Sequence, residues 1–358
     1  MASVNFFDKL SDDIIGACLI PCLGSSLHSI SLLASVSKRF RKIICSNQYH
    51  ESSFWADINV SICIDTYCPI CNLNTNKVKF KKSAFSLLSS YPIENLQMHC
   101  FVSDIYDVLT SLISKQTIKN INLKLTNKLS SPPLVEILSQ SIIPDCFQQL
   151  RSLTINSTNL NHVNLAGRVL ILQLLGRNLE YLKFEGLTPV GIFKIISQVC
   201  VHLKNLRVDK VKSGVDFNEL HSDTIEEIAL CRAQFIPDNL KKFSRLSSLR
   251  YTSWAHLNGI QIEHIILSLP QSIKSLDMEI PSSFVDLMYL SVARRLPEIE
   301  TLILESSHER GIISADVLLN LAHQCKCIKH FEIYRFIYLF IIIYFYNFTK
   351  TFLLHITY

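Results

Sequence analysis

The sequence has few of the residues from which enzymes build phosphate-binding loops and catalytic turns. Only 9 of its 358 residues are glycine, and its 12 histidines are scattered along the chain. It contains no Gly-rich phosphate loop, no Gly-x-Ser-x-Gly turn and no His-Glu-x-x-His segment. These absences argue against an enzyme, and we expect neither a catalytic residue nor a cofactor.

Charge is also scarce, at 18% of the residues against 48% hydrophobic ones. The 35 basic and 30 acidic side chains leave a net charge of only +5. Binding to nucleic acid depends on clustered Lys and Arg that meet phosphates. This balance therefore gives no reason to expect a nucleic acid as partner, and the high apolar content indicates a folded chain.

No secretory signal is visible in residues 1–13, which lack both a basic and an apolar region. We therefore expect a cytoplasmic or nuclear protein, or one found in both compartments, whose 12 cysteines stay reduced. Cys68-Pro69-Ile70-Cys71 resembles half of a zinc site, and Cys63, His99 and Cys100 are the candidates for the remaining ligands. A second closely spaced pair is missing, so an ordinary loop is the favoured interpretation and no metal is expected.

One pattern recurs ten times: a large apolar residue, two variable residues, an apolar one, a variable one and a final apolar one. Successive copies begin 21 to 32 residues apart, and most spacings fall within the roughly 20–29 residues of leucine-rich repeats. The copies are Ile93-Leu96-Met98, Ile118-Ile121-Leu123, Leu150-Leu153-Ile155, Leu179-Leu182-Phe184, Leu203-Leu206-Val208, Ile225-Ile228-Leu230, Leu246-Leu249-Tyr251, Ile273-Leu276-Met278, Ile299-Leu302-Leu304 and Ile328-Phe331-Ile333.

The pattern indicates a strand in each copy, because its fourth and sixth positions share one face of a strand and the first turns inward at its start. Helical periodicity occupies the segments between the strands. We expect helices over residues 134–143 and 190–199, and helices capped by Ser103, Ser282 and Ser314. A strand–helix unit cannot cover its own apolar face, so stacked units build one core. The prediction is an α/β solenoid over residues 93–333, a horseshoe with parallel strands inside and helices outside.

Residues 7–60 do not fit the repeat and read as three short helices, over residues 12–23, 30–37 and 38–45. Leu10-Ser11-Asp12-Asp13-Ile14-Ile15 opens the first helix, with polar residues ahead of the apolar run. Val36-Ser37-Lys38-Arg39-Phe40 joins the second helix to the third, and Trp55 follows. This arrangement resembles an F-box. It departs from the family at Ser11, where a proline is usual, and in the longer turn over residues 24–29.

An F-box followed by leucine-rich repeats is typical of substrate receptors of Skp–cullin–F-box ubiquitin ligases. The resemblance implies that the F-box binds a Skp-type adaptor and, through it, a cullin, while the repeats bind the target protein. The residues that it assigns to adaptor binding are Leu10, Ile14, Ile15, Val36, Lys38 and Phe40. The alternatives are a helical cap on a repeat scaffold or inhibitor without a link to ubiquitin, or a membrane-anchored recognition protein.

Two further segments complete the predicted organisation, a connecting segment over residues 61–92 and a hydrophobic tail over residues 334–358. The tail is apolar over residues 336–346 and is then interrupted by Asn347, Thr349 and Lys350. A membrane helix needs about 20 apolar residues, so a membrane is not an expected partner. An artefactual or truncated C-terminus, a hydrophobic cap and a membrane anchor remain open interpretations.

The third, fifth and seventh positions of each copy are predicted to face the open side of the solenoid. In the first five copies these positions carry three basic and two acidic residues, and in the last five they carry one basic and five acidic residues. The net charges are therefore +1 and −4. We hypothesise that the acidic half receives a basic segment of the target, through residues that include Glu227, Arg250, Asp277, Glu279 and Glu305.

Overall fold

The computed structural model divides into two compact units, residues 1–179 and 180–358. It describes residues 59–63, 94–101, 118–126, 149–157, 175–186, 191–210, 216–238, 240–253, 257–306, 314–334 and 353–357. The predicted F-box lies outside these residues except for its last two positions, and the connecting segment lies outside them after Cys63.

The described part of the first unit consists of parallel strands that pair in chain order. The strands are β1 (Asn59–Cys63), β2 (Asn95–Phe101), β3 (Asn120–Thr126) and β4 (Ser152–Ser157). Their register aligns equal positions of the repeat, so that Leu96 lies opposite Ile121 and Ile121 opposite Leu153. All three side chains are buried, as the alternation predicts.

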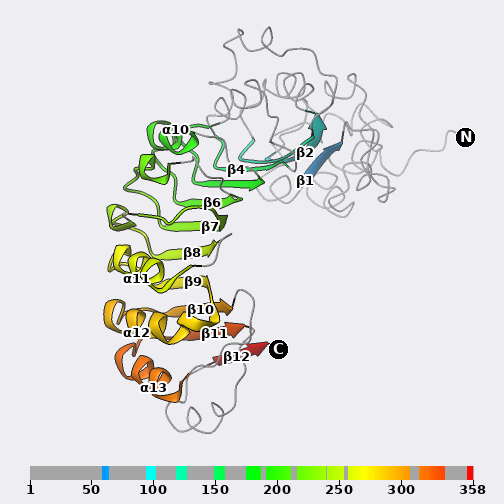
Figure 1. Ribbon diagram of the computed structural model, residues 1–358. Coiled ribbons are helices and arrows are strands. Elements are labelled where there is room, and N and C mark those ends of the chain that lie inside the picture. Colours follow the sequence, from blue (N-terminus) through cyan, green and yellow to red (C-terminus); the bar gives the residue numbers. More distant parts are fainter. Residues whose placement is uncertain are drawn as a thin grey trace, which may run out of the picture. The chain divides into compact units, whose positions relative to one another are not determined.

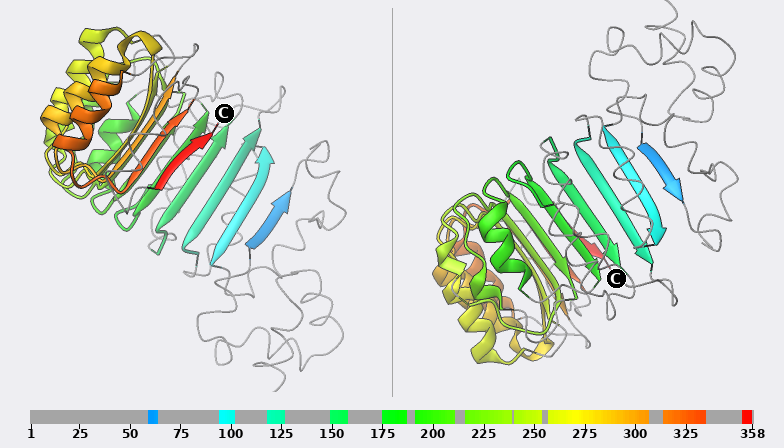
Figure 2. Two further views of the ribbon diagram at one scale, coloured as in Figure 1. Left: turned by 90° about the horizontal axis from the view of Figure 1, so that it is seen from below. Right: turned by 90° about the horizontal axis from the view of Figure 1, so that it is seen from above.

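The second unit has the same kind of arrangement, with eight described strands that are parallel and pair in chain order. The helices α10 (Ile192–Val199), α11 (Gly259–Ser268), α12 (Val285–Arg295) and α13 (Ala315–Gln324) lie on one side of these strands (Figures 1 and 2). The strands are β5 (Tyr181–Gly186), β6 (Asn205–Asp209), β7 (Glu227–Ala233), β8 (Ser248–Ser253), β9 (Ser275–Ile280), β10 (Thr301–Ser306), β11 (His330–Tyr334) and β12 (Leu353–Thr357).

The core is built from the first, fourth and sixth positions of the repeat. Each of these side chains that the structure describes, which is all but Ile93 and Ile333, is buried. The fourth positions form one continuous row in the second unit, from Leu182 on β5 to Phe331 on β11. The described residues therefore form an α/β solenoid of the leucine-rich-repeat type, and the predicted strand register is confirmed.

Strands β1 and β12 are additions to the ten predicted strands. Val60 of β1 lies opposite Leu96, and Leu354 of β12 lies opposite Phe331, so both strands keep the register of the repeat. The residues three positions earlier, Asp57 and Thr351, are polar. A pattern that requires an apolar first position therefore misses both strands.

The length of each repeat decides what covers its helical side. The copies that begin at Ile225 and Leu246 follow their predecessors after only 22 and 21 residues. Their connections contain the short 3₁₀ helices η6 (Phe217–Glu219) and η7 (Leu240–Lys242). Aromatic rings fill the space there, since Phe217 lies 5.3 Å from Phe193 and 5.9 Å from Phe243 between ring centroids.

The longer repeats hold the α-helices, with two differences from the predicted helix starts. Ser314 caps α13 as expected, with its hydroxyl accepting a hydrogen bond from the Val317 N–H at 3.3 Å. The predicted cap at Ser282 is wrong, because a 3₁₀ turn over Ser282–Phe284 follows Pro281 and α12 begins only at Val285. The helix expected over residues 190–199 is α10, which begins at Ile192 after Gly191 in the left-handed conformation (φ 77°). The helices expected after Ser103 and over residues 134–143 lie outside the described residues.

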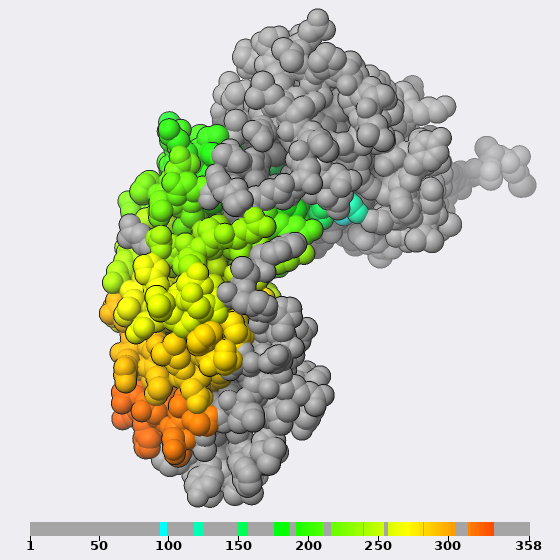
Figure 3. Space-filling model, viewed as in Figure 1, coloured from blue at the N-terminus to red at the C-terminus, as the bar shows by residue number. Residues whose placement is uncertain are grey.

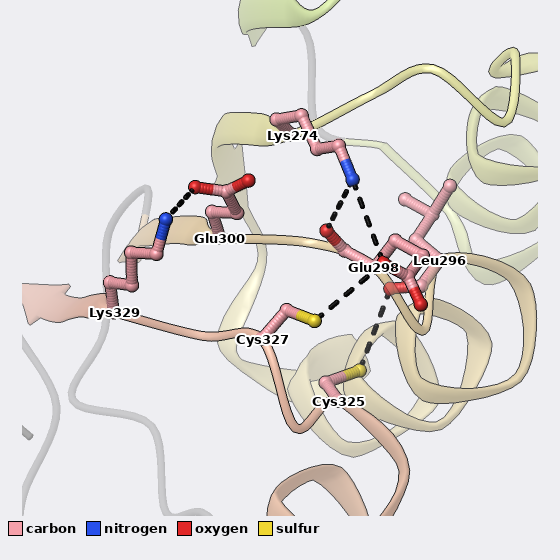
Figure 4. A network of polar contacts seen from close by, with 7 residues as sticks. All are labelled: Lys274, Leu296, Glu298, Glu300, Cys325, Cys327 and Lys329. Carbon is pink, nitrogen blue, oxygen red and sulfur yellow. Dashed lines mark hydrogen bonds and ion pairs between the residues drawn. The ribbon is translucent and has the colours of Figure 1, made fainter.

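In eight of the ten repeats, the residue at the second position links neighbouring repeats at the start of the strands. Its carbonyl accepts two N–H bonds from the next repeat; the Glu300 carbonyl, for example, accepts from Lys329 at 2.8 Å and from His330 at 3.1 Å. The side chains add alternating charge, as between Glu180 and Lys204 (2.9 Å) and between Glu300 and Lys329 (2.5 Å; Figure 4). Hydrogen bonding to the Lys329 ammonium and its charge lower the pKa of Glu300. These contacts fix the register where each strand begins.

Buried cysteines are the C-cap residues of α10 and α13. Cys200 and Cys325 each stand three residues before the first apolar position of a repeat, and their N–H groups donate to Ile196 and Leu321 of the preceding helices. The Cys325 thiol donates to the Leu296 carbonyl at 3.6 Å (Figure 4). Burial raises the pKa of Cys200 to about 12 and that of Cys325 to about 11, so both thiols stay protonated and serve packing.

Alanine at a fourth position should be far more destabilising than alanine at its neighbour on the open side. We expect Leu206→Ala and Leu249→Ala each to lower the free energy of unfolding by about 2–5 kcal/mol, because both side chains are fully buried. Arg250→Ala should cost much less, since an exposed ion pair contributes about 0–1 kcal/mol. Chemical denaturation of the three variants measures the difference, and equal losses for Leu249→Ala and Arg250→Ala would refute the register.

Candidate functional site: the open strand face

The side of the second unit opposite its α-helices carries the third, fifth and seventh positions of the repeats, which we call the strand face. The four α-helices described in this unit all lie on the other side of β5–β11 (Figures 1 and 2). Every described side chain at these positions is partly or fully exposed. The strand face of this unit is therefore a surface that a partner can reach.

The helical side is different in character. Side chains of α11, α12 and α13, coloured yellow to orange, form a continuous surface along this unit (Figure 3). It exposes single apolar side chains such as Ile260 and Leu267 of α11, which are 81% and 52% exposed. Scattered exposed apolar residues are normal on protein surfaces, so the charged strand face is the stronger candidate for a specific site.

On β5 and β6 the charges of the strand face are paired within each strand. Lys183 forms an ion pair with Glu185, and Arg207 Nε lies 3.7 Å from Asp209 Oδ1. On β7 the Glu227 carboxylate accepts a hydrogen bond from the Asn205 side chain of β6 at 2.6 Å. Local pairing therefore removes most of the net charge from this half of the strand face.

On β9, β10 and β11 the strand face forms a grid of three rows. Ser275, Thr301 and His330 share the first row, and Asp277, Ile303 and Glu332 share the second. Glu279 and Glu305 lie opposite each other in the third row. Ile303 therefore lies in the middle of the grid, with carboxylates on both neighbouring strands and one, Glu305, two residues along its own strand.

Among the described residues, Arg250 outside the grid and His330 within it form ion pairs with its carboxylates. Arg250 Nε of β8 lies 3.2 Å from Asp277 Oδ2, and His330 Nε2 lies 2.7 Å from Glu332 Oε1. Four carboxylates and one guanidinium give the grid and Arg250 together a charge of −4 + 1 = −3 with His330 neutral.

Asp277 experiences this excess of negative charge directly. Burial raises its pKa above the ordinary value, the charges of Glu305 and Glu332 raise it further, and only Arg250 opposes them. Like charges on one face of neighbouring strands destabilise a sheet. The raised pKa of Asp277 reflects this repulsion by Glu305 and Glu332 in addition to its burial.

The structure brings most of the predicted target-binding residues together. Arg250, Asp277, Glu279 and Glu305 lie on the adjacent strands β8, β9 and β10, whereas Glu227 lies on β7 beside Asn205 and apart from the other acids. Ile303 and His330 belong to the same grid and were not among the predicted site residues, whereas Glu332 is one of the five acidic residues that the sequence placed on the open side. The signal for Ile303 and His330 was present in the sequence, because they occupy the fifth and third positions of their repeats.

Other predicted sites fall wholly or partly outside the described residues. These include the adaptor-binding residues Leu10, Ile14, Ile15, Val36, Lys38 and Phe40, as well as Cys68 and Cys71. Of the remaining candidate zinc ligands, Cys63 of β1 lies opposite His99 of β2. Among the residues that were described, no group of three metal-ligating side chains gathers, and no helix has the length and apolarity to cross a membrane.

Cys231 is a thiol on the strand face, at the seventh position of β7, next to Asp209. Burial raises its pKa to about 11, and the Asp209 carboxylate acts in the same direction. A thiol that stays protonated at neutral pH is a poor nucleophile. We therefore assign Cys231 a role in packing between β6 and β7.

No protein-family model and no curated protein matches the chain. Among solved structures it is similar to the complex of Rad7 and Elc1 in yeast, with a TM-score of 0.43 and 12% identity over 96% of this chain and 92% of that chain. It is also similar to an internalin from Listeria monocytogenes, with a TM-score of 0.37 and 12% identity over 80% of this chain and 87% of that one. Both TM-scores are low, so the fold is assigned from the strand register and buried positions of the chain itself. These define an α/β solenoid with an open, charged strand face.

Asp277 should make the protein less stable as the pH rises. Because its folded-state pKa is raised, its ionisation costs more in the folded than in the unfolded chain. The stability that its protonation provides is complete below the unfolded pKa of about 4 and is lost as the pH rises through the folded pKa. We expect the free energy of unfolding of Asp277→Asn, relative to the wild type, to increase over this interval and then level off. Denaturation at a series of pH values measures it, and a constant or falling difference would contradict the assignment.

Proposed function

We propose that this protein is the substrate-recognition subunit of a cullin-type ubiquitin ligase. In this proposal residues 7–60 bind a Skp-type adaptor, and the strand face of the repeats binds the target protein. The observation that carries it is the open, charged strand face of a leucine-rich-repeat solenoid that follows an F-box-like sequence in the same chain.

The solenoid supports the target-binding half of this proposal. Repeat proteins use extended surfaces for protein recognition, because each repeat adds strand positions without closing a cavity. On β5–β11 these positions carry charged and polar side chains at regular spacing, over a core that makes their positions rigid. Such a surface fits recognition of a polypeptide, and the subunit itself would be non-catalytic.

The sequence of residues 7–60 supports the adaptor-binding half. Leu10, Ile14 and Ile15 precede or begin the first expected helix, and Val36, Lys38 and Phe40 occupy the junction of the second and third. Apolar residues on short helices bind a partner by burying their shared face. A Skp-type adaptor acts inside the cell, so the proposed location is the cytoplasm, the nucleus or both.

A repeat scaffold or inhibitor without a link to ubiquitin is the second candidate. It is favoured by the fact that the strand face and the solenoid core need no adaptor to form or to bind. The two candidates differ in one measurable property, which is the binding of a Skp-type adaptor by the N-terminal residues.

Replacing Ile14 and Ile15 together by Asp should abolish co-purification with a Skp-type adaptor. The change places two charges into an apolar contact that binding removes from water. A matched control is the double variant Ile260→Asp with Leu267→Asp on the exposed surface of α11. This control should bind the adaptor as the wild type does.

Thermal unfolding of both double variants shows whether the repeats remain folded. If the wild type itself fails to bind the adaptor, or if Ile14→Asp with Ile15→Asp binds it at wild-type affinity, the ligase proposal is wrong and the scaffold candidate replaces it.

A further inference from the structure

We infer that the outer surface of α11, α12 and α13 binds the same surface of a second copy of this chain, with each helix antiparallel to its own counterpart across a two-fold axis. The three helices lie next to one another on the helical side of the second unit (Figures 1 and 3). The inference concerns the side opposite the strand face, and the contact itself does not depend on the proposed ligase role.

The three helices are aligned, with their first turns next to one another. Leu287 of α12 packs against the start of α11, where a Cβ atom on Gly259 would lie only 3.0 Å from Leu287 Cδ2. The Ser314 N–H, at the N-cap of α13, donates a hydrogen bond of 3.2 Å to Asp286 Oδ1 in the first turn of α12. Because the helices have 10, 11 and 10 residues, their last turns are aligned as well.

Exposed apolar side chains lie at both ends of α11. Among the residues that the structure describes, the exposed large apolar side chains are those of Val201, Ile260, Leu267 and Leu319, and three of these four lie on α11 or α13. Ile260 in the first turn of α11 and Leu267 in its last turn are seven residues apart and share one face of the helix. In an antiparallel pair, Ile260 of one copy therefore meets Leu267 of the other, and both apolar side chains are covered.

The charges on α12 and α13 also match when each helix lies antiparallel to its counterpart. Asp286 lies in the first turn of α12, and Arg294 and Arg295 lie in its last turn. In α13, Asp316 lies in the first turn and His323 in the last. The acidic end of each helix therefore faces the basic end of its counterpart, and this complementarity favours the antiparallel orientation over the parallel one.

Three of these charged residues have no partner within the described part of the chain. Arg294, Arg295 and Asp316 form no ion pair there, and Arg294 and Asp316 are exposed. On the strand face, by contrast, the basic residues Lys183 and Arg207 are paired within their own strands. A second copy supplies the opposite charges that this surface lacks.

The helix dipole explains part of this pattern but not all of it. Acidic residues at the start of a helix and basic residues at its end stabilise the helix itself, as in α12 and α13. The first turn of α11 has no acidic residue and its last turn no basic one, and both turns expose an apolar side chain instead. A two-fold interface requires a surface that is complementary to itself, and all three helices meet this requirement.

The size of the surface predicts a weak dimer that forms with rising concentration. Three helices, each about 15 Å long and spaced about 9 Å apart, cover roughly 400 Å² of projected area on each copy. Interfaces that bury less than about 1,200 Å² in total are typical of transient complexes. We therefore expect a dissociation constant in the micromolar range.

Such a dimer leaves the strand face of the second unit uncovered in both copies, because the helices lie on the other side of β5–β11 (Figure 2). If the strand face binds targets as proposed, the dimer has two binding surfaces. A target with two binding segments then binds more tightly than one segment does alone, because the second contact forms within the same complex.

Sedimentation equilibrium of the full-length protein from about 1 to 100 μM tests the dimer. The average mass of the wild type should rise with concentration from that of the monomer towards that of the dimer. Ile260→Asp should raise the dissociation constant about tenfold or more, because it places a charge into an apolar contact. The matched control, Val201→Asp, makes the same kind of change at an exposed apolar residue that follows α10 and should leave the dissociation constant unchanged.

Two charge-reversed variants test the antiparallel arrangement. Arg294→Asp places an acidic group against Asp286 of the second copy, and Asp286→Arg places a basic group against Arg294 of the second copy. Each variant alone should stay monomeric at concentrations at which the wild type dimerises. An equimolar mixture of the two should form a heterodimer, because both contacts then join opposite charges. Thermal unfolding of each variant shows whether the repeats remain folded.

The inference is overturned if the wild type stays monomeric over the whole concentration range, or if Ile260→Asp and Val201→Asp dimerise equally well. It is also overturned if the folded charge-reversed variants fail to form a heterodimer. Should Asp286→Arg not fold, the comparison of Ile260→Asp with Val201→Asp decides alone, since both changes are at exposed positions. Adaptor co-purification is independent of these measurements. A dimer that does not bind the adaptor rejects the ligase role alone, whereas a monomer that binds it rejects this inference alone.

Discussion

Each repeat of this protein has an apolar face that only its neighbours can cover, and the other features of the structure depend on that requirement. The side chains at the first, fourth and sixth positions of successive repeats align in register and are buried against one another. A residue such as Leu206 is buried because Leu182 and Ile228 lie opposite it on both sides. The stack is therefore stable as an array, and no single strand–helix unit would be stable alone.

The same register decides where the polar side chains lie. When alternate residues point into the core, the remaining ones form rows across the strand face, and their spacing is set by the sheet. Ion pairs within β5 and β6, the Asn205–Glu227 hydrogen bond and the grid around Ile303 all follow from this arrangement. A binding surface of this kind is rigid, because the core and the hydrogen bonds at the second positions hold the strands in place.

Variation in repeat length affects the helical side and leaves the strand face regular. Short repeats replace an α-helix by a 3₁₀ turn, and the rings of Phe193, Phe217 and Phe243 fill the space. Strand pairing continues through these repeats, with one register shift between Leu230 and Ala233 of β7. Changes in repeat length on the helical side therefore have little effect on the strand face that is proposed to bind targets.

The sequence alone determined the repeat, its register and the burial of its apolar positions, because alternation in a strand is a local property of the chain. It also predicted that acidic residues gather at the open positions of the later repeats. It missed β1 and β12, whose register is kept although Asp57 and Thr351 are polar, and it misplaced the start of α12.

Only the tertiary structure decided which charged side chains contact one another. Asp277 lies beside Arg250 because β8 and β9 pair, and Ile303 lies among the carboxylates because β10 pairs with both β9 and β11. Contacts between residues about 26 positions apart depend on how the repeats stack, so no local pattern of the sequence predicts them.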